Sequence, residues 1–294
     1  MKAEPQRCEV WGVLNVTPDS FSDGGDYLRF DDAVRHGRRL LREGADVIDV
    51  GGASSRPRGG LYGAGAARVA PAEERARVVP VVEALARELR ARVSIDTIEA
   101  EVARAAIEAG ATVVNDVSCG QHEALRRVVA DAGVEYVLMH TRGRGEVQPP
   151  NTRYADVVAE VCAELLAAVE RAVKVGIARE RIWIDPGIGF AKTAAQSLAL
   201  LAHTDAFAAL GLPVLVGPSR KGFIAEVAPG ANGAPPAPAD RLGGTLAAVT
   251  TAVLGGAAAV RVHDVAAARQ AVDVACALRA AGGAPAFTLA GGLR

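Results

Sequence analysis

Short apolar runs alternate with longer amphipathic segments along most of the chain. The runs are rich in Val and Ile and are continuously apolar rather than alternating with polar residues. Strands that are covered on both faces have this pattern. The runs occupy positions 10–16, 47–50, 93–95, 112–114, 136–139, 182–184, 213–216 and 259–262. The pattern therefore predicts eight buried strands.

Between the runs lie segments with helical periodicity, bounded by residues that begin or end helices. The clearest are 31–43, 99–109 and 153–175, each followed by a glycine. Asp31 and Asp32 favour the N-terminus of the first, because carboxylates are favourable near the positive end of the helix dipole. Eight strand–helix units in one chain predict an α/β fold, a (β/α)8 TIM barrel. An open, doubly wound parallel sheet is the alternative.

No domain boundary interrupts this alternation, so we expect a single domain over residues 1–294, with its core at about 8–281. Glycines spread through 57–70 predict a flexible loop, and prolines in 229–240 predict an exposed irregular insertion. We expect the tail at 282–294 to be frayed.

Composition narrows the class of protein. Half of the 294 residues are hydrophobic, 23% are charged, and the net charge is −1. A disordered chain would be poorer in apolar residues, and a nucleic-acid-binding protein would carry a basic stripe. No apolar run is long enough to span a membrane and no export signal opens the chain, so we expect a cytoplasmic protein without nucleic-acid or membrane partners. The cysteines are scattered singly, which is typical of reduced, mostly buried thiols: Cys8, Cys119, Cys162 and Cys276.

Every predicted strand ends in side chains that can hydrogen-bond or carry charge. In chain order they are Asn15, Asp49, Asp96, Asn115 with Asp116, His140, Asp185, Ser219 to Lys221, and Arg261 with His263 and Asp264. Any one of them could be a helix cap or a turn residue. In a barrel, however, these ends meet at the mouth where active sites lie, and eight in succession indicate a site.

The residue types indicate two kinds of chemistry. Asp96, Asn115 and Asp185 suit a flat ring rich in hydrogen-bond donors, because a carboxylate accepts from two adjacent N–H groups. Arg261 and His263 suit an anion, since phosphate sites in this fold favour the last two strand–helix loops. We also expect Ser219 to cap a helix that begins near residue 220. The inferred ligands are therefore a polar planar ring and a phosphate-like group. We expect His140, in contrast to the other strand-end residues, to have a structural role.

These residues lie in strings that resemble, block by block and in order, the signatures of the dihydropteroate synthase family of pterin-binding enzymes. The strings are WGVLNVTPDSFSDGG (11–25), IDVGGASSRP (48–57), SIDT (94–97), VNDV (114–117), LMH (138–140), IDPGIGFAKT (184–193), GPSRKGF (217–223) and RVHDV (261–265). The resemblance implies a barrel that joins 4-aminobenzoate to a dihydropterin diphosphate with the help of Mg²⁺ and releases diphosphate. It also implies a homodimer that sulfonamides inhibit.

The resemblance assigns roles position by position. The pterin site would contain Asp49, Asp96, Asn115, Met139, Asp185 and Lys221, and the 4-aminobenzoate site Phe21, Ser55, Arg56, Pro57 and Ser219. The diphosphate would meet Asn15, Arg56, Arg261 and His263, with Asn15 also binding Mg²⁺. The catalytic residues would be Asp23, Arg56, Lys221, Arg261 and His263. The implied reaction is a dissociative displacement, in which Asp23 lies near a pterin cation and the other groups stabilise the departing diphosphate.

The chain departs from the family pattern in three places. Ala53 stands where the family usually has Glu, Ser55 where it has Thr, and Ala191 where it has Gly. The Thr-to-Ser and Gly-to-Ala changes are expected to be tolerated. The glycine-rich 58–68 segment lengthens the second loop, and ordering a longer loop costs more entropy. We therefore expect weaker capture of 4-aminobenzoate than in typical members.

Two other interpretations remain open from the sequence. Pterin-binding methyltransferase domains that serve a corrinoid partner share the barrel, but they lack the full 4-aminobenzoate loops that 11–25 and 48–57 match. A non-catalytic paralogue would bind pterin without forming product, and the altered second loop is its support.

Overall fold

The barrel is described from a computed structural model, which covers residues 7–16, 26–53, 69–143, 147–230 and 233–282. Its strands are β1 (Glu9–Asn15), β2 (Val47–Gly51), β3 (Val93–Asp96), β4 (Val113–Asp116), β5 (Glu135–Met139), β6 (Ile182–Asp185), β7 (Leu215–Val216) and β8 (Ala259–Val262). They form one parallel sheet in the order β6-β5-β4-β3-β2-β1-β8-β7. A bridge from Ile184 to Val214 joins its two edges. The barrel is therefore nearly closed, and the open-sheet alternative is wrong.

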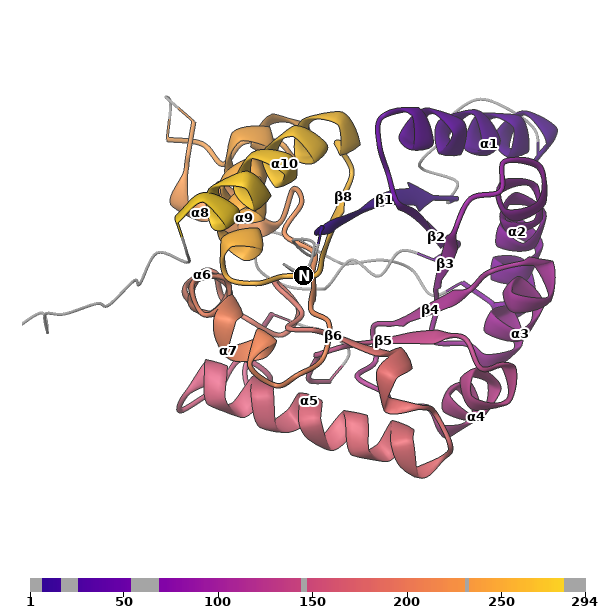
Figure 1. Cartoon of the computed structure of the whole chain (residues 1–294), viewed down its shortest axis with the longest axis horizontal. Helices are drawn as coiled ribbons and strands as arrows, with labels where there is room; N and C mark the ends of the chain where they lie inside the picture. The colour runs from indigo at the N-terminus through magenta and orange to yellow at the C-terminus, as the bar shows by residue number, and fades with distance from the viewer. Residues whose placement is uncertain (1–6, 17–25, 54–68, 144–146, 231–232, 283–294) are drawn as a thin grey trace, which may run out of the picture.

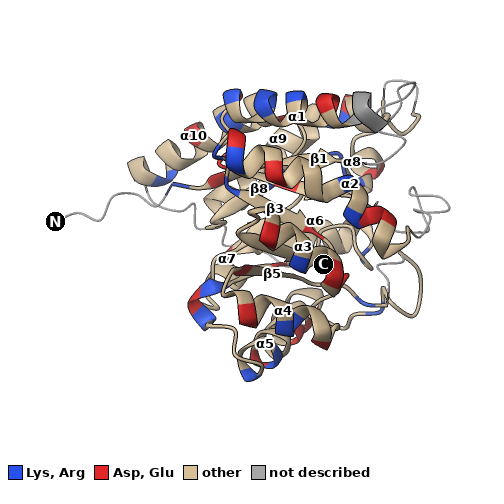
Figure 2. Ribbon diagram, turned by 90° about the vertical axis from the view of Figure 1, so that its right-hand side faces the viewer, with Lys and Arg blue, Asp and Glu red and all other residues tan. Residues whose placement is uncertain are grey.

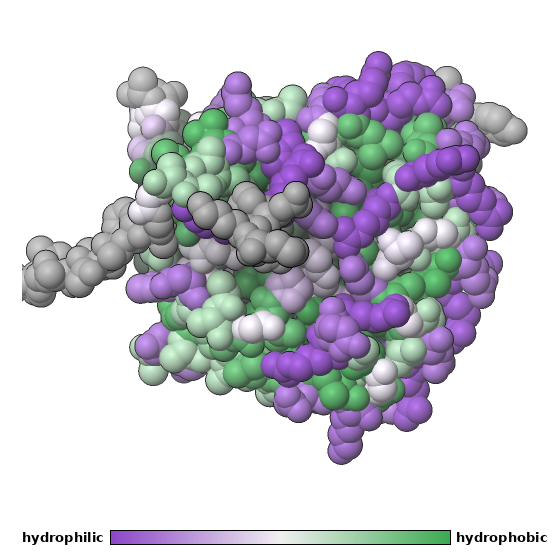
Figure 3. Space-filling model, viewed as in Figure 1, coloured by the Kyte–Doolittle hydropathy of each residue, from purple (hydrophilic) through white to green (hydrophobic). Residues whose placement is uncertain are grey.

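Helices surround the strands on the outside (Figure 1). They are α1 (Asp26–Arg42), α2 (Pro71–Glu83), α3 (Ala100–Ala109), α4 (Glu123–Ala132), α5 (Val157–Lys174), α6 (Ala194–Ala202), α7 (Thr204–Ala208), α8 (Gly222–Val227), α9 (Leu242–Leu254) and α10 (Val265–Gly282). Charged residues recur along α1 (Figure 2), and hydrophilic side chains gather on the surface there (Figure 3). In the described part of the chain, none of the helices combines the length and the apolarity that a membrane crossing needs.

Several predicted boundaries shift for local reasons. Helix α1 begins at Asp26 rather than Asp31, so the expected acidic start lies in its second turn. Helix α5 begins at Val157 rather than at residue 153, because the Asp156 carboxylate accepts the N–H groups of the first turn at 3.0 Å. Strand β7 is shorter than 213–216. The described part of 229–240 is exposed as expected and ends in a 3₁₀ turn at Pro238–Arg241.

The barrel interior is filled by side chains that alternate along the strands. An inner apolar cluster consists of Trp11, Val47, Val113, Val137, Leu215 and Ala259, with Trp183 packed against it. The rings of Trp11 and Trp183 lie 5.5 Å apart. This cluster separates two polar layers of the interior, one at each end of the barrel.

Candidate active site

The polar layer at the carboxyl ends of the strands, called the upper polar layer below, follows from the alternation of side chains along each strand. Residues two apart point to the same side of a strand. Asp49, Asn115, Met139, Asp185 and Arg261 each lie two residues after a member of the inner apolar cluster or after Trp183. They therefore point into the barrel just above that cluster, at the carboxyl ends of the strands.

Arg261 holds two of the carboxylates together. Its Nε lies 2.5 Å from Oδ2 of Asp49, and its Nη2 lies 2.9 Å from Oδ2 of Asp96. The Asn115 amide donates to the same Asp49 oxygen at 3.3 Å. The other oxygens, Oδ1 of Asp49 and Oδ1 of Asn115, are buried without a hydrogen-bond partner among the described residues. An unpaired buried acceptor is costly, so these oxygens favour a ligand that brings N–H donors.

Burial shifts the pKa of three titratable groups beside this layer, Asp96, Asp185 and Lys221. Burial raises the pKa of Asp96 to about 7, against the attraction of Arg261. Burial also raises the pKa of Asp185 to about 6, although the Gly187 N–H donates to its carboxylate at 2.7 Å. Lys221 is affected in the opposite sense, because burial and the nearby Arg261 charge lower its pKa to about 7. A ligand whose donors and acceptors match these groups would settle their protonation.

Ser219 and His263 follow β7 and β8, and the helix cap expected at Ser219 is wrong. Helix α8 begins at Gly222 with no side-chain cap, two residues later than expected. The Ser219 hydroxyl instead contacts Nδ1 of His263 at 3.0 Å and accepts that residue's backbone N–H at 3.2 Å. Burial lowers the pKa of His263 to about 3, so its ring is neutral. In the tautomer in which Nδ1 accepts from the Ser219 hydroxyl, the proton lies on Nε2, which is then a donor for an anion.

Three of the strand-end residues point away from this layer, because each directly follows an inward-facing one. Asp116 accepts from the Ser118 N–H at 2.7 Å, and Asp264 forms a two-point pair with Arg220. His140 is fully buried between two charged residues, in agreement with the structural role expected for it.

Asn15 lies at the rim of the mouth. It ends β1, is exposed, and pairs in register with Gly51. The described residues contain no cluster of three His, Cys, Asp or Glu that could hold a metal. A single amide oxygen nevertheless fits Mg²⁺ where substrate phosphates supply further ligands. The predicted site residues Phe21, Asp23, Ser55, Arg56 and Pro57 lie outside the described residues.

Residues 190–192 were given no role from the sequence, although the IDPGIGFAKT string contains them. The Lys221 ammonium lies 4.0 Å from the centre of the Phe190 ring. Ala191 has a φ of +52°, a left-handed conformation that favours glycine. Lys192 is buried behind Asp185. The only sequence signal for these three residues is that the IDPGIGFAKT string resembles a signature of the family.

Comparison with known proteins places these residues in a family. The family model described as "Pterin binding enzyme" matches residues 11–263. Dihydropteroate synthase of Mycobacterium leprae is 49% identical over 263 residues, which is 88% of this chain and 89% of that protein. The Escherichia coli dihydropteroate synthase is 40% identical over 256 residues, covering 87% of this chain and 86% of that protein.

Solved structures agree with the sequence comparison. The Xanthomonas albilineans dihydropteroate synthase with 4-aminobenzoic acid has a TM-score of 0.84 and 43% identity, over 93% of this chain and 94% of that chain. The Clostridium difficile enzyme in the presence of pteroic acid also has a TM-score of 0.84, with 35% identity over 95% of this chain and 99% of that chain. The chain therefore belongs to the pterin-binding enzyme family and, within it, to the dihydropteroate synthases.

Proposed function

We propose that this barrel joins 4-aminobenzoate to a dihydropterin diphosphate, giving dihydropteroate and diphosphate. The observation that carries the proposal is the upper polar layer. There, the buried acceptor oxygens of Asp49 and Asn115 have no partner among the described residues and lie beside the Arg261–Asp49 ion pair. The related structures with 4-aminobenzoic acid and with 7,8-dihydropteroate support the same substrates and product.

The pterin ring would be recognised by its edge. Its amino group and the neighbouring ring N–H are adjacent donors, and a carboxylate such as that of Asp185 can accept from both. Asn115 offers one donor and one acceptor for a mixed edge. Asp49 and Asp96 remain ordered beside them through Arg261, while the polarisable Met139 side chain packs on the ring. Lys221 would donate to a ring acceptor.

The reaction replaces a carbon–oxygen bond with a carbon–nitrogen bond. As the bond to diphosphate breaks, negative charge gathers on the leaving group and positive charge spreads into the pterin. The Nε2–H of His263 and the Arg261 guanidinium donors beyond those used on Asp49 and Asp96 would stabilise the leaving diphosphate. The arylamine then attacks and loses its proton to water, so no strong general base is needed.

By resemblance, the loop residues outside the described chain complete this site. Arg56 would stabilise the leaving diphosphate, and Asp23 would lie near the developing cation. Phe21, Ser55 and Pro57 would frame 4-aminobenzoate, with Ser219 near its carboxylate. We propose Asn15 as the side chain that binds Mg²⁺ together with the diphosphate. When bound, Mg²⁺ would neutralise negative charge on the leaving group.

We also propose a homodimer formed through α9 and α10, which pack against each other. Helix α9 contains no charged residue, and α10 exposes Val274 and Leu278 by 55% and 54%. Much of α10 is uncharged in Figure 2, unlike α1. Val274→Glu should convert the dimer to monomers in sedimentation experiments.

The four cysteines are free, which supports a reducing compartment such as the cytoplasm.

Turnover tests the proposed activity. The protein is incubated with dihydropterin diphosphate, 4-aminobenzoate and Mg²⁺, and both dihydropteroate and diphosphate are measured. We expect both products in equal amounts, with loss of turnover on addition of a chelator. Pterin binding without product would instead favour a non-catalytic paralogue.

A further inference from the structure

A chain of buried polar contacts lies behind the pterin site. The Lys192 ammonium lies 2.9 Å from Nδ1 of His140 and 2.9 Å from the Phe190 carbonyl oxygen. It also reaches the His140 carbonyl oxygen at 3.5 Å. Its three N–H donors therefore all have acceptors, two of them on the residue that follows β5.

The two ring contacts of His140 define its tautomer when Lys192 is charged. When Lys192 is protonated it can only donate, so Nδ1 is then the unprotonated nitrogen and Nε2 carries the proton. Nε2 lies 2.9 Å from the Glu164 carboxylate and donates to it. Burial, together with the Lys192 charge, lowers the pKa of His140 to about 4, which agrees with a neutral ring.

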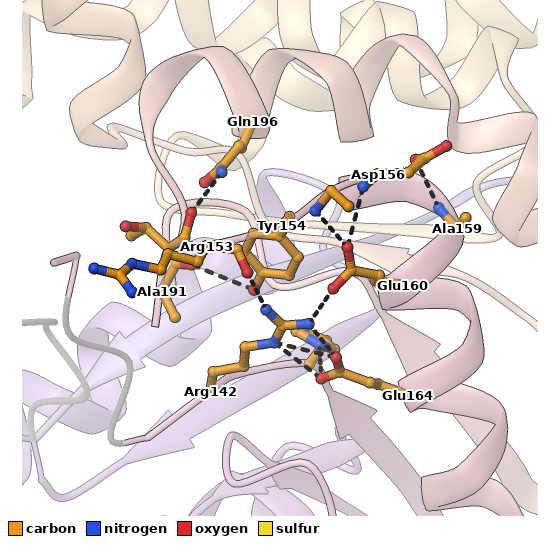
Figure 4. Close-up of polar contacts among 12 residues, drawn as sticks. Arg142, Arg153, Tyr154, Asp156, Ala159, Glu160, Glu164, Ala191 and Gln196 are labelled. Carbon is orange, nitrogen blue, oxygen red and sulfur yellow. Dashed lines mark hydrogen bonds and ion pairs between the residues drawn. The ribbon is translucent and has the colours of Figure 1, made fainter. Parts of the chain in front are cut away.

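Helix α5 anchors the outer end of this chain of contacts. Arg142 donates to Glu164 and, at 2.7 Å, to Glu160, and its guanidinium stacks 3.8 Å from the Tyr154 ring centre (Figure 4). The Tyr154 hydroxyl donates to the Ala191 carbonyl at 3.3 Å. The contacts thus return to the segment that precedes Lys192.

The inner end reaches Asp185. The backbone N–H of His140 donates to the Asp185 carbonyl at 2.8 Å, and the N–H of Gly187 holds the Asp185 carboxylate. A Cβ built on Gly187 would lie 1.9 Å from the His140 carbonyl oxygen and 3.4 Å from Nζ of Lys192. The turn after Asp185 therefore lies directly between the pterin site and the ammonium.

We propose that Lys192 is a positioning residue for the pterin site: its ammonium joins the loop after β6 to the end of β5 and so holds Asp185 and Met139 in place. This inference rests on the proposed function. The choice of residue supports it, because lysine occurs at four positions in a chain with 33 basic residues: Lys2, Lys174, Lys192 and Lys221. A compact ammonium can use three acceptors in a narrow site, whereas a planar guanidinium cannot replace it there.

The charge of Lys192 also acts on Asp185. Lys221, Arg261 and Lys192 all lower the pKa of Asp185 against the larger effect of burial. Lys192 itself is faced by Asp185 from β6, Cys119 from the loop after β4, His140 and Arg142 from the end of β5, and Glu164 from α5. Burial lowers its pKa to about 7, opposed first by Asp185. Removing the ammonium should make Asp185 harder to ionise.

The test is pteroic acid binding by isothermal titration calorimetry across pH, with Lys192→Met and the exposed Lys174→Met as matched control. We expect Lys192→Met to weaken binding about tenfold and to move the acid limb of its pH profile upward by about half a unit. Lys174→Met should match the wild type. A folded Lys192→Met protein with unchanged affinity and profile would overturn the inference.

A second pair avoids the risk that Lys192→Met does not fold. Glu164→Gln removes the partly exposed carboxylate that supports His140 and Lys192, and Glu160→Gln removes its neighbour on Arg142. We expect about threefold weaker binding near neutral pH for Glu164→Gln but not for Glu160→Gln, because loss of the Glu164 charge lowers the pKa of Lys192 further. Identical behaviour of the two variants would overturn the inference. Failure of the wild type to bind pteroic acid would overturn the proposed function as well.

Discussion

The two polar layers of the barrel interior differ in how their charges are paired. At the amino ends of the strands, Arg92 donates to both Glu9 oxygens at 2.7 and 2.9 Å and to Glu135, while the Trp11 indole donates to Glu9 at 2.8 Å. At the mouth, carboxylates are buried with raised pKa values and two acceptors lack partners among the described residues. The charges at the amino ends of the strands are paired with one another, whereas the mouth requires a ligand to complete its hydrogen bonds.

The largest effect should come from the apolar layer between the two. Trp11→Ala removes a fully buried ring that contacts Trp183 and donates to Glu9. We expect the free energy of unfolding to fall by about 3–5 kcal/mol in urea titrations. Pteroic acid affinity of the remaining folded protein should change little. A large loss of affinity at full folding would contradict the separation of the two layers.

Asp185→Asn should have the converse effect at the mouth. The variant keeps the shape of the side chain but loses the charge that would accept from the pterin donors. Hydrogen bonds to a charged group contribute about 1.5–3 kcal/mol each, so pteroic acid affinity should fall by about a hundredfold or more. Calorimetry measures the binding and a thermal melt the folding. A lower melting temperature would show that Asp185 supports the fold as Arg92 does.

The difference in stability between the wild type and the same variant should depend on pH in a defined direction. Burial raises the pKa of Asp185 to about 6, above the value of an unfolded chain, so the folded state binds this proton more tightly. Wild-type stability is therefore lost as pH rises from about 4 to 6, and Asn is spared this loss. The advantage of Asp185→Asn over the wild type should grow by about 1–3 kcal/mol from about pH 4 to about pH 6 and then stay level. A constant difference across that range would contradict the raised pKa.

The sequence predicted the mouth well where strand ends alone decide position. Asp49, Asn115 and Asp185 follow buried apolar runs and meet there, whereas Asp116, which was expected beside them, accepts from the Ser118 N–H instead. The barrel was predictable for the same reason, since eight apolar runs alternate with helical segments. The inward direction of these side chains follows from the period of two along a strand.

Other features depended on contacts between distant segments. The expected Ser219 cap fails because Arg220 has a φ of +59°, which delays the start of α8 and turns Ser219 to His263. The burial of Lys192 depends on a histidine 52 residues earlier in the chain, and no local pattern encodes that meeting. Such pairings require the packed structure.

A substitution at the rim of the mouth should have a smaller effect than one in the polar layer beneath it, and it should affect one substrate only. Ala53 follows β2 at the edge of the mouth, where the family resemblance places Glu. Ala53→Glu should lower the KM for 4-aminobenzoate about threefold, because a carboxylate there would help to order the second loop. The KM for the pterin diphosphate should stay unchanged. Steady-state kinetics with each substrate varied in turn would expose an equal change in both.

The smallest effect should come from strain at the mouth. Among the described non-glycine residues with positive φ, Cys119, Ala191 and Arg220 lie in loops that follow strands, and Arg90 alone lies at the opposite end. A left-handed alanine costs about 1–2 kcal/mol, whereas glycine avoids this cost but loses about 0.5–1 kcal/mol in chain entropy. Ala191→Gly should therefore raise the free energy of unfolding by less than about 1 kcal/mol. The Ala191 carbonyl oxygen also accepts a hydrogen bond from the Tyr154 hydroxyl. Measuring pteroic acid affinity together with stability therefore shows whether the strained backbone contributes to binding. A stabilised variant with weaker binding would mean that it does, and unchanged binding would mean that the strain is only tolerated there.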